Sequence, residues 1–202
     1  AFVGRGGLLK PLSGGTYLVN NKMLEDLKAA RYGEHASNLG AIIAFDFAQK
    51  HGKNAYVVNP VVVDELMDIA RITGLPEMQN ISIFHALNQK AVAKRACNEM
   101  GIDYRSARLI VAHLGGGISV GVHENGKVID VNNALEDGPF TPERAGTLPM
   151  KQVIELCYSG KYTKKELMRK LIGNSGLIAH TGTSDCRVLV EKAETDDNVR
   201  LV

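Results

Sequence analysis

The chain has 202 residues, of which 45% are hydrophobic and 23% charged, with a formal net charge of +2. This composition is typical of a globular chain with one large or two small cores, and it excludes an intrinsically disordered protein. No apolar run reaches the ~18–20 residues of a membrane-spanning helix. The nearly neutral charge includes no basic stripe, so nothing supports a nucleic-acid partner.

Cys97, Cys157 and Cys186 are few, odd in number and far apart, and no Cys-x-x-Cys pair is present for zinc or redox chemistry. Free thiols suit a reducing compartment, so we expect a cytoplasmic location. The simplest interpretation of all three cysteines is that they are small apolar core residues.

The first half of the chain predicts strands alternating with helices. Residues 1–20 contain a short strand, a glycine-rich loop and the extended piece GTYLV. Helical spacing of apolar residues predicts helices over 21–31 and 36–50, and NAYVVN at 54–59 is typical of a buried strand. Apolar residues from Val63 to Ala70 also recur at i, i+3, i+4 and i+7, which predicts another helix.

The second half continues the alternation. ISIF at 81–84 is expected to be extended, and a helix is expected from Ala86 to Met100. Leu109–Val131 predicts strands on both sides of a glycine run, followed by a hairpin turn at Asn125-Gly126. After a loop at 132–147, helices are expected at about 148–158, at 163–172 with a capping box, and near 185–193.

This order of elements predicts an α/β fold, with a seam between two parts near residues 60–80. The chain begins with AFVGRGG, apparently inside a strand, and ends with NVRLV, which looks like the start of a strand. We therefore expect the sequence to be an excerpt of a longer protein.

The glycine run is His113-Leu114-Gly115-Gly116-Gly117, between two predicted strands. Glycine has no Cβ, so backbone N–H groups in such a loop can approach a phosphate, and Ser119 could add a hydroxyl. An ordinary wide hairpin loop is the alternative. The run matches neither the Walker A loop nor Gly-x-Gly-x-x-Gly, and the residues alone leave both interpretations open.

Four further positions have a functional and a structural interpretation. His85 follows an apolar segment and could reach a cleft, or it could cap the next helix. His35 stands where a helix begins and could line an anion site, or it could form part of the cap with Ser37. Arg144 lies in an exposed loop, where arginines are usually only solvated. In GTSDCR, Thr183 or Ser184 is expected to cap a helix whose first turn holds Asp185 and Arg187, and capping explains this motif.

No zinc site is visible. His123 and His180 lack a helical partner at metal-ligand spacing, and both are expected on loops or on a strand surface.

Seven segments in series resemble the acetate/butyrate kinase family of the actin and sugar-kinase superfamily. They are GRGGLLKPLSGGTY, GEHASNLGAIIA, NPVVVDELMDIARITGLP, SIFHALNQKAVA, IVAHLGGGISVG, VIDVNNALEDGPFTPERAG and ELCYSGKYT. The resemblance implies a fragment of a two-domain actin-like ATPase (ribonuclease H-like) α/β fold. Residues 1–62 would be the remainder of the first domain and residues 63–202 most of the second.

The resemblance also implies an activity. Such a kinase transfers the γ-phosphoryl group of ATP to the carboxylate of butyrate or a similar short-chain fatty acid, reversibly, giving an acyl phosphate and ADP, with Mg²⁺ and as a homo-oligomer. A kinase that prefers acetate or propionate is one alternative. A nucleotide-binding fragment without turnover is the other.

Carried over by position, the family's site residues fall in three groups. The catalytic group is His85, Arg144 and Arg5, of which Arg144 clamps the transferring phosphoryl group and Arg5 takes over the substrate carboxylate. The group that binds phosphate and nucleotide is His113, Gly115, Gly116, Gly117, Ser119, Asp185 and Arg187. The group that forms the substrate pocket is Gly4, His35, Phe84 and Pro142.

Three positions depart from acetate kinases. Arg5 stands where they have a histidine, and their substrate-binding arginine would align with Phe2. Gly4 stands where they have a larger apolar residue, which would leave room for a longer acyl chain. Asn59 stands where they have an aspartate that helps to hold Mg²⁺ through water. A shift of the alignment onto Asp64 would restore the carboxylate.

Overall fold

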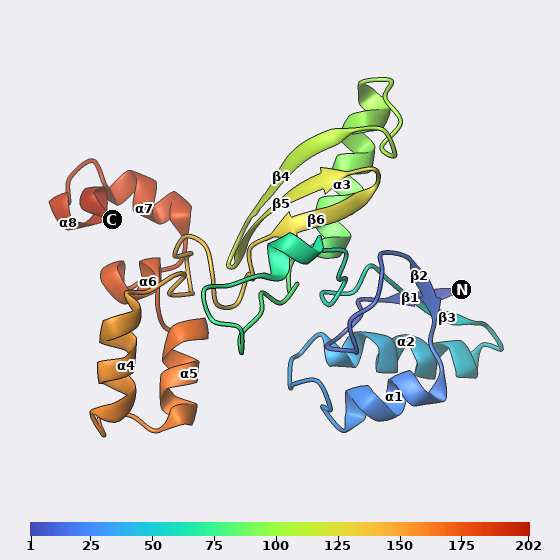
Figure 1. Cartoon of the computed structure of the whole chain (residues 1–202), viewed down its shortest axis with the longest axis horizontal. Helices are drawn as coiled ribbons and strands as arrows, with labels where there is room; N and C mark the ends of the chain where they lie inside the picture. Colours follow the sequence, from blue (N-terminus) through green and yellow to red (C-terminus); the bar gives the residue numbers. More distant parts are fainter. The chain divides into compact units, whose positions relative to one another are not determined.

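The computed structural model describes residues 1–202, which form two compact units. Unit 1 comprises residues 1–111 and 120–132, and unit 2 comprises residues 112–119 and 133–202. Figure 1 shows the elements of both units along the chain.

The first sheet of unit 1 consists of β1 (Phe2–Gly4), β3 (Ala55–Val58) and β2 (Thr16–Leu18), in that order. Strand β1 is parallel to β3, and β2 is antiparallel to it. Helix α2 (Asn38–Lys50) packs on β1 and β3, and α1 (Asn21–Lys28) packs on α2 (Figure 1). These elements confirm the strands and helices predicted for this part of the chain.

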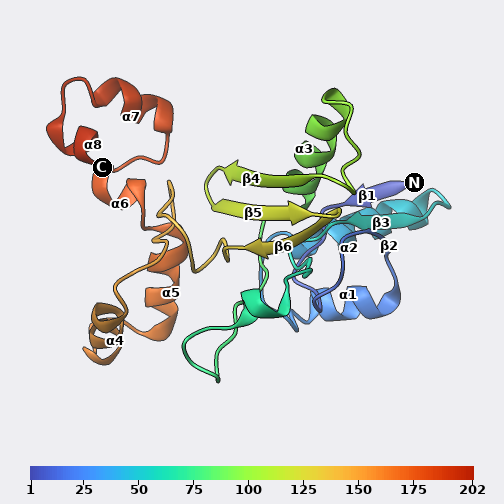
Figure 2. The same ribbon diagram turned by 45° about the horizontal axis from the view of Figure 1, so that its top comes forward.

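The second sheet is formed by β4 (Arg108–Leu114), β5 (Ile118–Glu124) and β6 (Lys127–Val131) in sequence order, as Figure 2 shows. Asn125 and Gly126 both have positive φ, +52° and +76°, so the predicted hairpin turn is confirmed. Helix α3 (Ala86–Glu99) was also predicted, and its apolar face packs in a core with β4.

The helix predicted from Val63 to Ala70 is wrong. Only a short 3₁₀ helix, η1 (Asp68–Arg71), forms there. The backbone upstream of it bonds to other segments: Asp64 N–H donates to Leu12 O and Met67 N–H to Ile129 O, both at 2.9 Å. These long-range bonds take the place of the i to i−4 hydrogen bonds of the helix that the apolar spacing predicted. The segment 81–84, which was expected to be extended, does not pair as a strand in either sheet.

One hydrophobic core cluster ends in the sequence at Val62, and a second begins at Val63. The buried residues of the first all lie before residue 63, and those of the second lie between 63 and 131. The domain boundary expected at 62/63 falls between these two clusters, whereas the two compact units are divided elsewhere. The boundary stays a prediction.

Unit 2 is mainly helical beyond the glycine run. Its helices are α4 (Met150–Tyr158), α5 (Lys164–Gly173), α6 (Leu177–Thr181), α7 (Cys186–Lys192) and α8 (Asp197–Leu201). Helices α4, α5 and α7 and the capping box at Thr163 confirm the predictions. Helix α6 was not predicted, and the strand expected at NVRLV is wrong, because Asp196 caps α8 there.

The cysteine interpretation holds for one residue of three. Cys97 is fully buried in the core beside β4, whereas Cys157 and Cys186 are exposed. Both exposed cysteines lie on helices that have a solvent-facing side.

None of the helices is long and apolar enough to span a bilayer.

Candidate active site

The structure brings Arg144 onto the glycine run of unit 2. A Cβ on Gly117 would fall on the Arg144 guanidinium, so only glycine lets the arginine approach the loop this closely. A Cβ on Gly115 would lie 3.1 Å from His113 Nε2, which places the His113 ring against the same run. Three predicted features of the site are therefore adjacent in space.

The Arg144 side chain is half-buried, and its Nη1 donates to Ala134 O at 2.5 Å. Burial lowers its pKa from the ordinary value, and the neighbouring Glu143 carboxylate partly offsets this. A guanidinium stays charged under these conditions. The alternative that Arg144 is only a solvated surface arginine is therefore wrong, because it places a fixed positive charge beside backbone that has no side chains. Its catalytic role stays a prediction.

The backbone of the helical part of unit 2 holds the loop that carries Arg144. Leu177 N–H donates to Thr141 O at 3.0 Å, and Ile178 N–H donates to Pro142 O at 3.1 Å. Pro142, predicted to line the substrate pocket, is half-buried in this loop. The loop is thus held at its start by the first turn of α6.

Ser119 and the pair Asp185 and Arg187 also belong to unit 2. Ser119 is fully buried on β5. Asp185 caps α7 by accepting from Arg187 N–H at 3.0 Å, and it accepts a second bond from Arg187 Nη2 at 2.8 Å. Hydrogen bonds from Arg187 lower the pKa of Asp185. The helix cap therefore lies one or two residues later than predicted, at Asp185 rather than at Thr183 or Ser184, and the nucleotide role of Asp185 and Arg187 stays a prediction.

Unit 1 holds the other predicted site residues. His85 directly precedes α3 and is half-buried, and its side chain does not cap the helix. Phe84 is 2% exposed and packs in the second core with Val63 and Val128. Its ring faces core side chains here, so its role in an acyl pocket stays a prediction that this placement does not support.

His35 is exposed and forms a local turn before α2. Its Nδ1 accepts from Ser37 N–H at 3.1 Å and lies 2.7 Å from Ser37 Oγ. Ser37 is the N-cap residue of α2 and makes no side-chain cap bond, so the predicted cap is confirmed only as the place where the helix begins. The role of His35 in lining a cleft stays a prediction.

Gly4 makes close contact with α2. A Cβ on Gly4 would fall on Gly40 O, and a Cβ on Gly40 would fall on Arg5 O. The two glycines therefore let β1 and α2 touch along their backbones. This contact is a packing reason for glycine at position 4, independent of any acyl chain. The Arg5 side chain is exposed.

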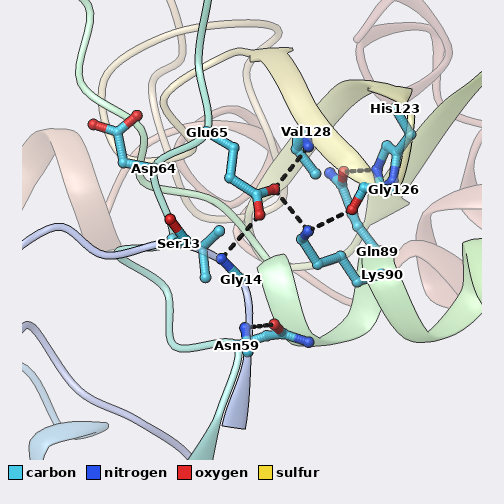
Figure 3. Close-up of polar contacts among 12 residues, drawn as sticks. Ser13, Gly14, Asn59, Asp64, Glu65, Gln89, Lys90, His123, Gly126 and Val128 are labelled. Carbon is cyan, nitrogen blue, oxygen red and sulfur yellow. Dashed lines mark hydrogen bonds and ion pairs between the residues drawn. The ribbon is translucent and has the colours of Figure 1, made fainter. Parts of the chain in front are cut away.

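The residues proposed for Mg²⁺ contact other parts of the chain. Asn59 has φ +41°, and its Oδ1 accepts from Gly15 N–H at 2.8 Å, as Figure 3 shows. Asp64 holds Arg71 through both oxygens, each at 2.7 Å. No group of three or more His, Cys, Asp or Glu side chains is placed to hold a metal ion. Mg²⁺ binding therefore stays a prediction.

Sequence reasoning missed a buried ion pair in unit 1, between Glu65 and Lys90, whose charged atoms lie 2.6 Å apart (Figure 3). Glu65 was placed on a predicted helix that does not form, and Lys90 looked like an ordinary polar position of α3. No local signal distinguishes either residue, because the partners are 25 residues apart and the pair exists only in the folded chain.

His123 is also buried, contrary to the expectation for it. Its Nδ1 lies 2.8 Å from Tyr104 Oη and its Nε2 lies 3.1 Å from Gln89 Oε1. Burial, with a smaller effect of Lys90, lowers the pKa of His123 to about 4. Strand alternation carries the missed signal, since Ser119, Gly121 and His123 share the buried face of β5. His180 is exposed, as expected, although it lies on α6.

The model of the acetokinase family matches residues 82–201, which is more than half of the chain and includes the glycine run and Arg144. The chain belongs to the acetokinase family. The curated relatives include butyrate kinase 2 of Clostridium acetobutylicum, which is 60% identical over 186 residues and matches 92% of this chain and 52% of its own length. A probable butyrate kinase of Clostridium botulinum is 52% identical over 98% of this chain and 56% of its own length.

This acetokinase-family chain thus spans about half the length of the curated relatives it matches. Among solved structures, it is similar to the acetate kinase of Porphyromonas gingivalis, with TM-score 0.80 and 19% identity over 98% of this chain and 53% of that one. A propionate kinase of Francisella tularensis gives TM-score 0.77 at 20% identity, over 99% and 55% of the two chains. These matches confirm the actin-like α/β fold class.

Proposed function

We propose that the protein containing this chain is an acyl kinase that transfers the γ-phosphoryl group of ATP to the carboxylate of butyrate or a similar short-chain fatty acid. Family membership and the two relatives named as butyrate kinases support this proposal. The observation that carries it is the Arg144 guanidinium against the Gly117 backbone. A fixed cation beside a loop without side chains suits a phosphoryl group in transfer.

The proposed reaction needs charge neutralisation more than proton transfer. A carboxylate is already a charged nucleophile, so no general base is required, and the difficulty is to bring two anions together. Arg144 and the N–H groups of the glycine run would stabilise the charge on the transferring group. The resemblance assigns a further catalytic role to His85. Arg5 would bind the carboxylate through its planar guanidinium. In-line positioning of the two substrates would supply the remaining rate enhancement.

Other parts of the proposal rest on the sequence resemblance alone. ATP and ADP follow from a kinase family, whereas Mg²⁺ stays a prediction because Asn59 and Asp64 are engaged with other groups. A cytoplasmic location and a homo-oligomeric state also stay predictions. The preference for a four-carbon acid rests on the relatives' names, since close packing already explains Gly4.

The test is an acyl-hydroxamate assay of the full-length gene product with ATP and Mg²⁺, supplied in turn with acetate, propionate, butyrate and isobutyrate. A preference for four-carbon acids is the expected result. A preference for acetate or propionate would keep the kinase and correct the substrate. A folded protein that binds ADP but forms no acyl phosphate from any acid would overturn the proposal.

A further inference from the structure

The hydroxyl of Thr141 connects the glycine run to the arginine loop. Thr141 is 3% exposed, and its Oγ1 donates to Gly116 O at 2.6 Å. The same oxygen accepts from the backbone N–H of Arg144 at 3.0 Å and from that of Glu143 at 3.2 Å. One side chain therefore fixes the distance between the two features that carry the proposed function.

Thr141 is itself held rigidly. Its N–H donates to Arg144 O at 3.0 Å, and its carbonyl oxygen accepts from Leu177 N–H at 3.0 Å. Gly176 has φ +71°, and a Cβ there would fall on Thr141 O, so the helical part of unit 2 presses directly on this residue. Because its own backbone is fixed, the Thr141 side chain can hold the glycine run in one position.

The glycine run needs such a connection, because Gly115, Gly116 and Gly117 have no side chains of their own to fix their conformation. The bond from Thr141 fixes the carbonyl of Gly116. In a planar trans peptide the next N–H points the opposite way, so this bond turns the Gly117 N–H away from Thr141. The contact thereby orients a donor of the phosphate loop as well as locating Arg144.

We propose that Thr141 is a positioning residue for phosphoryl transfer. Its hydroxyl holds Arg144 in place against the glycine run. The inference rests on the proposed function and deepens it. Thr141 does not need to touch substrate, because its hydroxyl bonds to the backbone of Gly116, Glu143 and Arg144 and so places the Gly117 N–H and the Arg144 guanidinium, which would touch it. Its effect on the reaction should therefore pass through Arg144.

The experiment is a double-mutant cycle in the full-length protein, with Thr141→Val made in the wild-type and in the Arg144→Ala background. Valine keeps the shape and removes the hydroxyl. In the wild-type background kcat should fall by about 10–10²-fold, as for a displaced catalytic group, with little change in KM. In the Arg144→Ala background the same change should cost less than about threefold, because the group it positions is already absent.

Two further variants make the cycle specific. Thr141→Ser keeps the hydroxyl and should restore most of kcat. Thr147→Val makes the same chemical change in the same loop, at an exposed hydroxyl that donates to Asp137 Oδ1 at 2.7 Å and not to the glycine run, and it should leave kcat unchanged. If Thr141→Val does not fold, as judged by its thermal transition, Thr141→Ala replaces it in the cycle.

Equal losses in both backgrounds would overturn the inference, because the hydroxyl would then act without Arg144. A Thr141→Ser variant as slow as Thr141→Val would also overturn it. If the wild-type protein is active and the cycle is additive, only this inference fails. If the wild-type protein forms no acyl phosphate, the proposed function fails and the inference with it.

Discussion

The carboxylate of Glu65 and the ammonium of Lys90 form an ion pair 2.6 Å apart, with side chains only 7% and 5% exposed. Glu65 also accepts from the N–H groups of Gly14 at 2.9 Å and Val128 at 2.8 Å, and Lys90 donates to Gly126 O at 3.1 Å. A Cβ on Gly14 would lie 2.6 Å from Lys90 Nζ. The pair thus joins helix α3, the β5–β6 hairpin and the loop before β2.

We expect Lys90→Met to lower the free energy of unfolding by about 3–5 kcal/mol, because it leaves the Glu65 carboxylate buried without its cation. The double variant Glu65→Gln with Lys90→Met should be more stable than Lys90→Met alone, since no unpaired charge remains. Chemical denaturation of the full-length protein measures both. A double variant less stable than either single variant would contradict this account.

Arg95 and Glu99 provide the matched control on the same helix. Their side chains lie 2.8 Å apart and are 82% and 64% exposed. Solvent screens such a pair, so Arg95→Met should change the free energy of unfolding by at most about 0.5 kcal/mol.

A second prediction concerns pH. Burial lowers the pKa of His123 to about 4 from 6.5, so the folded state holds a neutral imidazole while the unfolded chain binds a proton below pH 6.5. The contribution of His123 to stability is therefore complete above pH 6.5 and is lost as pH falls towards 4. Its size is roughly 2–3 kcal/mol.

Replacing His123 by Gln should flatten the pH dependence of the unfolding free energy between pH 4 and 6.5. The measurement is a set of denaturant titrations of the wild-type and variant proteins across that range. The difference between the two proteins isolates His123 from other titrating groups. An unchanged slope would show that His123 keeps the same proton affinity in both states.

Arg144→Ala should reduce kcat by about 10²–10³-fold, the usual cost of removing one group that stabilises the charge of a transition state. ATP affinity should change much less, because the guanidinium acts on the group in transfer. Steady-state kinetics and nucleotide binding separate the two quantities. Arg169→Ala, at an exposed arginine of α5, is the matched control and should leave kcat unchanged. An unchanged kcat in Arg144→Ala would remove the proposed role.

Gly4→Val tests whether glycine at position 4 is needed for the packing of β1 on α2 or for the choice of acyl chain. A side chain at position 4 would fall on the backbone of Gly40, so we expect a large loss of stability, seen as a lower thermal midpoint. Gly74→Ala is the control, since nothing lies within 4 Å of a Cβ there and its φ is not positive, and it should be nearly neutral. A stable Gly4→Val protein that shifts towards acetate would instead support the acyl-pocket role.

Elements that depend on local patterns were predictable from the sequence. Helix α5 has its capping box at Thr163 and Glu166, and the Asn125-Gly126 turn needs only two residues that tolerate positive φ. The contacts that decide these features lie within a few residues of one another. The family resemblance likewise rests on short segments that can be compared without a fold.

Only the tertiary structure decided the remaining features, because their partners are distant in sequence. Residues 63–67 have helical spacing, yet their backbone bonds to Leu12 and Ile129. Gly4 is explained by Gly40, and Lys90 by Glu65. The resemblance had named Arg144 as catalytic, but its contact with Gly117 forms only in the folded chain. A sequence pattern records which side chains can be buried, but which groups meet there depends on how the whole chain packs.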